Sequence, residues 1–299
     1  MKIRRISDEL KKKYGQKIYK LSLSAGCTCP NRDGRLGFGG CTFCSEGGSG
    51  DFAARPAPVA EQIAEARRRI DPKLPKSLAM EDRRFIAYFQ SFTNTYGDTG
   101  RLEQIFSEAE DQQEIIGLSI GTRPDCLEDD KISMLKRLNG RKPVWVELGL
   151  QTIHEETACR IHRGYSLPVF EDAYRRLKQA GLTVIVHVIL GLPRETEEMM
   201  LQTVRYLASL DPHPDGVKLQ LLHILKGTRL AEEYQERPFP VFTMEEYCRL
   251  VVKCLKILPE DVVIHRLTGD GPKKLLVAPL WSADKKRVLN MLNRCIEEA

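Results

Sequence analysis

Residues 18–44 read IYKLSLSAGCTCPNRDGRLGFGGCTFC and contain the two features that decide the fold. Residues 18–24 carry apolar, aromatic and β-branched side chains in partial alternation with polar ones, which predicts a short β-strand. The loop over residues 27–44 follows directly and holds four cysteines and four glycines. Glycine contributes no side chain to a core but permits tight backbone turns. In parallel α/β folds the loops after strands form active sites, so we expect this loop to carry the chemistry.

Strand-like runs alternate with amphipathic stretches along the rest of the chain. The predicted strands span residues 18–24, 84–91, 115–121, 144–151, 183–190 and 216–223. The helical patterns between them span residues 60–70, 129–138, 169–181 and 197–210. Almost wholly apolar strands that alternate with helices are typical of a parallel sheet covered by helices. The sequence therefore predicts an α/β fold with a curved parallel sheet or an open barrel.

The pattern changes after about residue 237. A helix over residues 242–258, one strand over 262–267 and a closing helix over 282–298 are predicted there. Full closure into an eight-stranded barrel would need two more strand–helix units than the chain supplies. We therefore expect a partial barrel over residues 1–237 and a small C-terminal extension over residues 238–299 that packs on the same domain.

Composition bounds the class of protein. The chain has 299 residues, a net charge of +5, 42% hydrophobic residues and 29% charged residues, which is ordinary for a globular protein. No apolar run approaches the roughly 20 residues of a membrane span, and the N-terminus lacks the apolar region of a signal peptide. A cytoplasmic protein without a membrane partner is expected, in which clustered cysteines bind metal or do redox chemistry. The basic residues in segment 2–13 could neutralise nucleic-acid phosphates or simply solvate the surface.

The spacing of the clustered cysteines favours an iron–sulfur site. Cys41 and Cys44 form a C-x-x-C pair, and eleven residues separate Cys29 from Cys41. Three thiolates suit a cubane cluster with one iron left free to bind another molecule. A structural zinc site remains the alternative, although it would need a fourth ligand that no second pair supplies. Cys27 is a possible fourth ligand; the other cysteines are single: Cys126, Cys159, Cys248, Cys254 and Cys295.

The motif CPNRDGRLGFGGCTFC (29–44) resembles the signature of the radical S-adenosylmethionine (SAM) superfamily, and its long first spacing is similar to the YhcC/YtqA-like subgroup. The resemblance implies a partial (β/α)6 TIM-like barrel with a 4Fe-4S cluster at its mouth, held by Cys29, Cys41 and Cys44. It implies SAM as the second cofactor, cleaved reductively to methionine and a 5′-deoxyadenosyl radical. Phe43 matches an aromatic residue near the adenine, and Cys27 has no counterpart among the ligands.

Several other segments resemble SAM-binding motifs of the superfamily. VELGLQ (146–151) is similar to the E-x-G-x-Q strand of Elongator-like and coproporphyrinogen-oxidase-like enzymes, which implies that Glu147 and Gln151 contact SAM and that Arg163 pairs with its carboxylate. From the residues alone, a buried hydrogen-bonded pair explains Glu147 and Gln151 equally well, and the alternative for Arg163 is an ordinary surface arginine. GLPRET (191–196) resembles the loop whose backbone lies against the adenine, and QSFTNTY (90–96) departs from the usual G-G-E-like segment. The expected SAM contacts in these two loops are Thr93, Asn94, Thr95, Gly191, Leu192 and Pro193.

Polar side chains within or just after the apolar strands are candidate substrate contacts. Ordinary packing or a turn explains each of them nearly as well. The candidates are Arg123 in TRPD (122–125), which is similar to a motif of the Elongator catalytic subunit, together with His187, Lys218, Gln220 and His223. Two late segments, RLTGDGP (266–272) and APLW (278–281), also look like the YhcC/YtqA-like subgroup.

The resemblance implies an enzyme that modifies tRNA at the wobble uridine, processing its 5-carboxymethylaminomethyl group towards 5-aminomethyluridine. It implies tRNA as a partner and a flavodoxin- or ferredoxin-type protein as the electron donor. Two alternatives stay open from the sequence: a radical SAM enzyme with a small-molecule substrate, and a non-catalytic zinc module that binds RNA.

Overall fold

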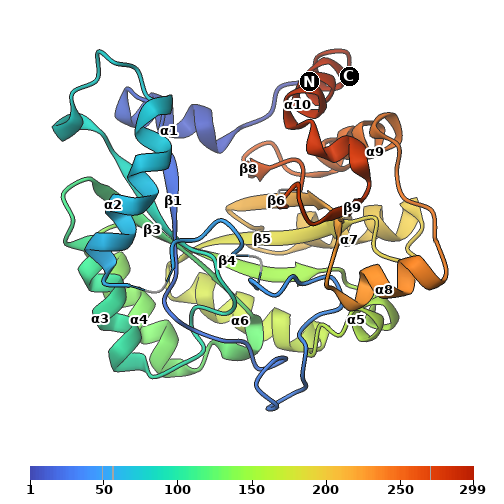
Figure 1. Ribbon diagram of the computed structural model, residues 1–299, viewed down its shortest axis with the longest axis horizontal. Coiled ribbons are helices and arrows are strands. Elements are labelled where there is room, and N and C mark those ends of the chain that lie inside the picture. Colours follow the sequence, from blue (N-terminus) through green and yellow to red (C-terminus); the bar gives the residue numbers. More distant parts are fainter. Residues whose placement is uncertain (49, 56, 270) are drawn as a thin grey trace.

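The computed structural model describes residues 1–48, 50–55, 57–269 and 271–299. Within them, seven parallel strands form one curled sheet in the order β1-β2-β3-β4-β5-β6-β8, and helices surround it (Figure 1). The strands of this sheet are β1 Tyr19–Leu23, β2 Phe85–Phe89, β3 Ile115–Thr122, β4 Val144–Gln151, β5 Thr183–Leu190, β6 Gly216–Leu221 and β8 Val263–Arg266. A small antiparallel pair, β7 Ile224–Leu225 and β9 Leu276–Ala278, lies beside it. The predicted α/β half-barrel is confirmed.

All six predicted barrel strands are present, and a seventh extends the sheet. The strand predicted over residues 262–267 is β8, which pairs in parallel with β6 along Gly216–Lys218. The strand predicted to run to residue 223 ends at Leu221, because the chain turns there into β7 and pairs with β9. The half-barrel therefore contains one more strand than the six-unit pattern indicates.

The helices lie mainly on the outer side of the sheet (Figure 1). Their bounds are α1 Ile6–Tyr14, α2 Val59–Ile70, α3 Thr99–Glu110, α4 Asp129–Asn139, α5 Glu155–Arg160, α6 Leu167–Gln179, α7 Glu197–Ser209, α8 Arg229–Glu236, α9 Met244–Ile257 and α10 Lys285–Glu297. The six predicted helices match α2, α4, α6, α7, α9 and α10 within a few residues. The sequence patterns missed α1, α3, α5 and α8. The start of α3 carries a readable signal, since the Asp98 carboxylate accepts the Arg101 backbone N–H at 2.8 Å as an N-cap.

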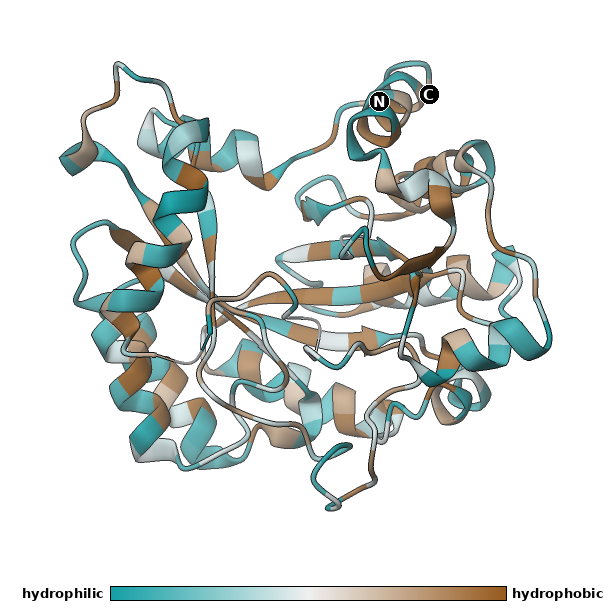
Figure 2. Ribbon diagram, in the orientation of Figure 1, coloured by the Kyte–Doolittle hydropathy of each residue, from teal (hydrophilic) through white to brown (hydrophobic). Residues whose placement is uncertain are grey.

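The core lies between the sheet and the covering helices. Every residue of β2, FIAYF, is buried, as expected for a parallel strand with both faces covered. On the outer face, Phe89 of β2 meets Phe106 of α3 edge to face with ring centroids 4.8 Å apart. Apolar residues concentrate on the strands and on one side of the covering helices (Figure 2). Buried strands therefore hold a rigid sheet whose carboxyl ends carry the long loops.

The sheet curls but does not close, so β1 and β8 are its edges. The N-terminal segment crosses to the far edge, where Arg5 forms a parallel bridge with Ile264 of β8. The N-terminal ammonium of Met1 donates to the carbonyl of Ile296 at 2.9 Å, which brings the two termini together (Figure 1). None of the described helices is long and apolar enough to cross a membrane.

Candidate active site

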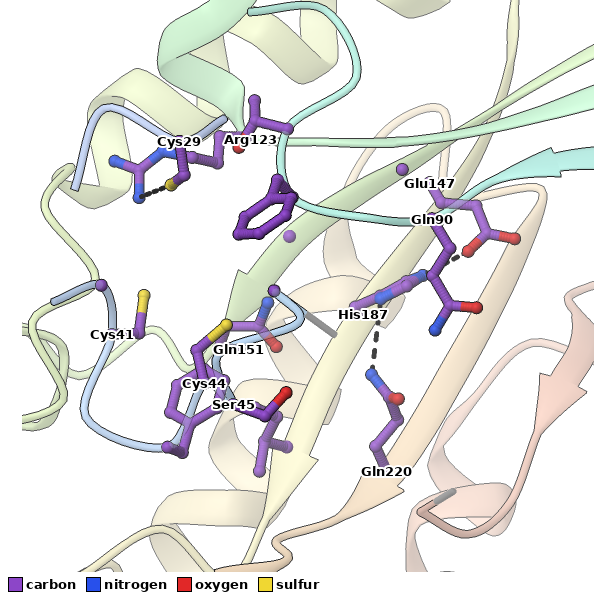
Figure 3. A pocket seen from close by; sticks show the side chains of 18 of the residues that line it. Cys29, Cys41, Cys44, Ser45, Gln90, Arg123, Glu147, Gln151, His187 and Gln220 are labelled. Atoms are coloured by element: carbon purple, nitrogen blue, oxygen red, sulfur yellow. Dashed lines mark hydrogen bonds and ion pairs between the residues drawn. The ribbon is translucent and has the colours of Figure 1, made fainter. Parts of the chain in front are cut away.

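A pocket opens at the carboxyl ends of the strands and brings the clustered cysteines together. Cys29, Cys41 and Cys44 all line it, and their thiols point into the same space (Figure 3). The loop that carries them leaves β1 and runs over the mouth of the half-barrel (Figure 1). The sequence prediction that residues 27–44 form part of the site is consistent with this placement.

Close backbone packing holds the cysteine loop in place. Gly40 has φ of 87°, in the left-handed region that favours glycine, and a Cβ there would lie 2.8 Å from Nε of Arg32. Arg32 in turn donates to the carbonyls of Cys44 and Ser45 at 3.1 and 2.6 Å. The Asn31 amide donates to the carbonyl of His162 at 2.7 Å and so ties the loop to the segment after β4. The same amide also donates to the Cys41 sulfur at 3.5 Å, so these bonds hold both the loop and one of its thiols in place.

The three thiols are not grouped as the ligands of a single metal ion would be. Among the described residues, no three His, Cys, Asp or Glu side chains converge as ligands of one ion would. A cubane takes each thiolate at a different iron, so its ligands lie further apart. Burial, with the neighbouring Cys44 and Cys29 thiols, raises the pKa of Cys41 to about 12. A thiol with such a pKa becomes a thiolate when a bound metal supplies the compensating charge.

Cys27 lies apart from this group. Its thiol contacts the carbonyl of Ala25 at 4.0 Å, and it is not among the described residues that line the pocket. Burial raises the pKa of Cys27 to about 11. The structure therefore separates Cys27 from Cys29, Cys41 and Cys44 and offers it as a matched control.

Gln151 is the predicted SAM contact whose geometry points most clearly to a ligand. It ends β4 with φ of 69°, an unusual backbone conformation for a residue other than glycine. Its side-chain oxygen is buried without a hydrogen-bond partner, although Gln151 lines the pocket. A Cβ on Gly149 would lie 2.9 Å from the Gln151 amide nitrogen, so glycine makes room for this side chain. An ammonium or hydroxyl donor in the pocket would satisfy the orphaned oxygen.

Phe43 and Thr93 also line the pocket. Phe43 packs against a small apolar cluster that contains Ile189, Leu192 and Leu222. Leu192, another predicted contact, is thus buried behind the pocket wall and does not line it. This cluster gives the pocket an apolar side on which a flat ring could lie.

Arg163 is only 1% exposed and is fully engaged by its own chain. Its guanidinium donates to the carbonyls of Leu150, Thr152 and Tyr165 at 3.1, 2.6 and 2.9 Å, and it pairs with Glu155. Arg163 therefore braces the turn after β4, at the wall of the pocket. A contact with the SAM carboxylate stays a prediction.

Of the remaining predicted SAM contacts, Glu147 lines the pocket, whereas Asn94 and Thr95 lie outside the pocket lining that the structure describes. The Asn94 amide donates to the carbonyls of Phe89 and Gly121 at 2.9 and 3.0 Å, and the Thr95 hydroxyl contacts Thr122 and the Cys126 carbonyl. These bonds close the loop between β2 and α3. The turn after β5, which comprises Gly191, Leu192 and Pro193, also lies outside the described pocket lining.

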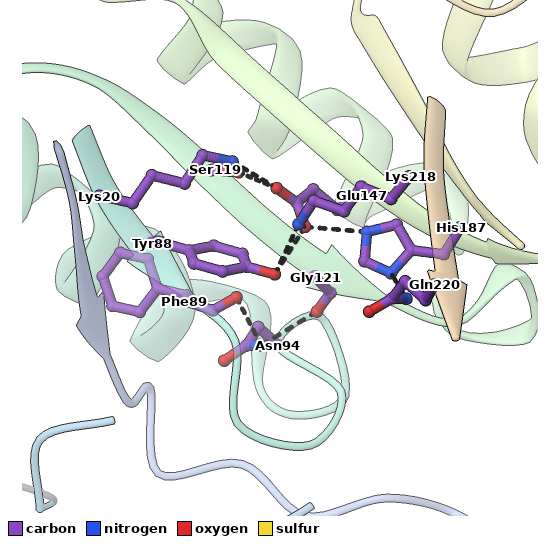
Figure 4. A network of polar contacts seen from close by, with 10 residues as sticks. All are labelled: Lys20, Tyr88, Phe89, Asn94, Ser119, Gly121, Glu147, His187, Lys218 and Gln220. Carbon is purple, nitrogen blue, oxygen red and sulfur yellow. Dashed lines mark hydrogen bonds and ion pairs between the residues drawn. The ribbon is translucent and has the colours of Figure 1, made fainter. Parts of the chain in front are cut away.

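The floor of the half-barrel is organised by Glu147, whose carboxylate is 1% exposed (Figure 4). One oxygen accepts from Lys20 at 2.5 Å and from the Ser119 hydroxyl at 2.7 Å. The other accepts from Tyr88 at 2.6 Å, from His187 at 2.9 Å and from Lys218. The donors come from five different strands. Glu147 thus joins the strands inside the curl, and its predicted contact with SAM stays a prediction.

Burial and the neighbouring charges together shift the pKa values of the groups in this network. Although burial alone would raise the pKa of Glu147, Lys20 and Lys218 hold it well below its usual value. Burial lowers the pKa of Lys218 well below its usual value against the opposing effect of Glu147. Burial and the nearby Lys218 charge lower the pKa of His187 to about 4, so this imidazole is neutral at physiological pH.

Four of the five predicted substrate contacts line the cysteine pocket: Arg123, His187, Gln220 and His223. The amide nitrogen Nε2 of Gln220 lies 3.4 Å from Nδ1 of His187, so these two side chains share one wall of the pocket. Arg123 forks onto both oxygens of Asp125 at 2.9 and 2.8 Å and places its remaining nitrogen 3.9 Å from the Cys29 sulfur. Lys218 lies deeper, at the floor.

His223 lines the pocket beside the turn RLTGDGP. A Cβ on Gly269 would lie 2.7 Å from Cε1 of His223, and one on Gly271 would lie 2.9 Å from Nδ1. The two glycines of this turn therefore allow it to pack on the imidazole. Trp281 of the APLW segment donates to the carbonyl of Phe242 at 2.7 Å, which is ordinary packing.

Sequence reasoning missed several residues of the site: Lys20, Tyr88, Gln90, Ser119 and Arg266. Each is a polar side chain in or at the end of an otherwise apolar strand. That signal was used for His187 and Lys218, and it could have found the others too. The sequence alone does not indicate that they meet on one carboxylate.

Comparison with known proteins places this architecture in a family. The profile of the radical SAM superfamily matches residues 29–207, and that of the radical SAM C-terminal domain matches residues 214–298. YtqA of Bacillus subtilis is 40% identical over 96% of this chain and 87% of its own length. YhcC of Escherichia coli K12 is 35% identical over 97% of this chain and 91% of its own length.

More distant relatives share the core. A tRNA uridine(34) acetyltransferase of Methanocaldococcus infernus is 29% identical over 54% of this chain and 30% of its own length. The solved structure of the archaeal M. infernus Elp3 lacking its N-terminus superposes with a TM-score of 0.63 at 21% identity, over 77% of this chain and 59% of that one. This likeness supports the fold alone.

Proposed function

The chain belongs to the radical SAM superfamily, with a 4Fe-4S cluster and SAM as its cofactors, and from that premise we propose that it modifies the wobble uridine of tRNA. The substrate that we propose is the 5-carboxymethylaminomethyl group, which the enzyme would process towards 5-aminomethyluridine. The similarity to a tRNA uridine(34) acetyltransferase over half of the chain carries the proposal of a tRNA substrate. Because the chain belongs to a family with a 4Fe-4S cluster, we set aside the alternative of a non-catalytic, zinc-binding protein that binds RNA.

The chain's own residues would divide the work as follows. Cys29, Cys41 and Cys44, which line one pocket, would hold the cluster. The orphaned side-chain oxygen of Gln151 would accept a hydrogen bond from the SAM ammonium. The apolar wall around Phe43 would receive the adenine.

The cofactors and the Arg123 side chain would support the reaction. When bound, the two cofactors supply reductive cleavage of SAM, which yields a radical able to remove a hydrogen atom from carbon. Arg123, held by Asp125 with one nitrogen 3.9 Å from the Cys29 sulfur, would place a positive charge beside the cluster. That radical would take a hydrogen atom from the carbon between the amine and the carboxylate of the substrate, which breaks a C–H bond there and forms one on the 5′ carbon. We propose a flavodoxin- or ferredoxin-type protein as the donor of the electron.

The test is anaerobic incubation of the cluster-loaded protein with SAM, a reductant and bulk tRNA from a strain that lacks the gene. Nucleosides are then measured by mass spectrometry. We expect 5-carboxymethylaminomethyluridine to fall and 5-aminomethyluridine to rise, and the Cys41→Ala protein to do neither. Unchanged wobble nucleosides, both in this incubation and in tRNA from the deletion strain, would refute the proposal.

The small-molecule alternative makes a different prediction in the same assay. A tRNA substrate is bound through its phosphates, so its affinity falls steeply as salt rises. A small substrate in a closed pocket would be nearly insensitive to salt. Salt-independent SAM cleavage that tRNA does not stimulate would favour the small molecule.

A further inference from the structure

Among the described residues, the floor of the half-barrel holds more basic than acidic side chains. Two ammonium groups, Lys20 and Lys218, share the single carboxylate of Glu147. The Lys218 residue is 3% exposed, and the Lys20 side chain is 23% exposed. Neutral His187 and the Tyr88 hydroxyl contribute hydrogen bonds to Glu147 without adding negative charge. Among the described residues, the floor thus holds two lysines and one carboxylate, and an anion that entered it would favour the protonated forms of the lysines.

A second hollow connects this floor to the outside. It lies at the open side of the half-barrel, between β1 with α2 and the edge strand β8. Tyr88, Gln90 and Arg266 line both this hollow and the cysteine pocket, so the two spaces adjoin. The described residues that line the hollow include five cations and no Asp or Glu: Lys20, Arg69, Lys73, Lys218 and Arg266.

The cations of the hollow are not equivalent. Arg69, at the outer rim, pairs with Glu65 on its own helix, which neutralises it. Lys73 is exposed at the same rim. Arg266 lies closest to the shared boundary and acts electrostatically on both Lys20 and Lys218. Arg266 is the one described cation that lines both spaces, so an anionic group at their boundary would lie beside it.

We propose that this adjoining space, bounded by Arg266, Lys20 and Lys218, binds an anionic oxygen group of the substrate. The inference rests on the proposed function, because it takes the substrate to be a modified tRNA. The chemistry is shared by two sources, the carboxylate of the carboxymethylaminomethyl group and a backbone phosphate. A carboxylate or a phosphate would form charge-assisted hydrogen bonds with the guanidinium, and its negative charge would favour the protonated forms of Lys20 and Lys218.

The test compares two anticodon stem–loop RNAs that differ only at the wobble uridine, one with the carboxymethylaminomethyl group and one with the aminomethyl group. Binding to the anaerobic holoenzyme is measured by fluorescence anisotropy over a range of salt concentrations. If the carboxylate is the source, the wild type binds the carboxylated RNA about tenfold or more tightly, and Arg266→Gln removes that preference. If a phosphate is the source, Arg266→Gln weakens both RNAs equally and reduces the salt slope by about one.

Controls separate a folding defect from a binding defect. Arg175→Gln, on the outer helix α6, removes an exposed arginine that pairs with Asp172 and should leave both affinities unchanged. Lys73→Gln changes an exposed position, and loss of RNA affinity with a shallower salt slope in this variant would support a basic entrance. Affinities and salt slopes that are unchanged in Arg266→Gln would overturn the proposal, whatever Lys73→Gln gives.

The outcome is separable from the proposed function. If the wild-type holoenzyme alters no wobble nucleoside, the proposed function fails whatever the binding comparison gives. If it modifies tRNA while Arg266→Gln binds both RNAs as the wild type does, the anion site alone fails.

Discussion

Replacing Glu147 by glutamine removes the carboxylate that, among the described residues, pairs with both lysines at the floor of the half-barrel. The change keeps the size of the side chain but leaves Lys20 and Lys218 without a counter-ion in a buried place. Removal of one partner from a buried ion pair costs about 3–5 kcal/mol. For a chain of 299 residues this corresponds to a loss of about 5–8 °C in Tm. Glu103→Gln, which breaks an exposed pair with Arg137, is the matched control and should cost less than about 1 kcal/mol.

The pH dependence gives the prediction a second readout. The pKa of Glu147 is held below its usual 4.5, so its contribution is complete above that pH and is lost as pH falls through the lower folded value. In the variant, the pKa of Lys218 should fall still further below its usual 10.5, because the attraction of the carboxylate is gone. The unfolded chain then binds more protons than the folded one, and stability of the variant rises with pH up to that value. The deficit should therefore be largest near neutral pH and shrink towards both extremes.

The assay is urea unfolding of the cluster-free proteins by circular dichroism at several pH values from 3 to about 10, the window set by these two pKa shifts. A variant within about 1 kcal/mol of the wild type at pH 7, with a deficit that does not vary with pH, would refute the reasoning. Glu147 would then not be the charge that compensates the lysines.

Three further substitutions test the cluster, the SAM pocket and the late turn. Cys41→Ala should lose most of the iron and sulfide after anaerobic reconstitution, whereas Cys27→Ala should retain them, and equal loss in both would contradict the ligand assignment. Gln151→Gly should raise the free energy of unfolding by about 1 kcal/mol by relieving its φ of 69°, yet weaken SAM about tenfold in equilibrium dialysis; unchanged SAM affinity would argue against the contact. Gly269→Ala places a Cβ 2.7 Å from the His223 ring and should cost about 1–3 kcal/mol in urea unfolding, and an unchanged midpoint would show that the turn yields freely.

The elements of the fold were largely predictable because parallel strands have a strong local signal. Strands covered on both faces are continuous apolar runs, and β4 and β5 were predicted with their observed bounds. The helices that were missed are short or weakly amphipathic on their own. In α1, Leu10 is the single buried residue, so little apolar periodicity marks it.

The cysteine motif was equally readable, since its meaning lies in local spacing. Cys29, Cys41 and Cys44 stand in one loop, and the structure brings them to one pocket. The surroundings of the motif were not readable in this way. Whether Arg163 faces a ligand or braces a turn depends on which carbonyls the fold places around it, and these belong to Leu150, Thr152 and Tyr165.

By itself, then, the order of residues determined the strand–helix alternation, the position of the cysteine loop after the first strand and the chemistry of its thiols. The curl of the sheet decided which side chains face one another across the half-barrel. Lys20 and Glu147 are 127 residues apart, and Lys218 lies 71 residues beyond Glu147, yet all three meet at the floor. Alternation along a strand assigns a side chain to a face, but register and curvature choose its partners across the barrel. The buried charge, and with it the proposed anion site, exists only in the folded chain.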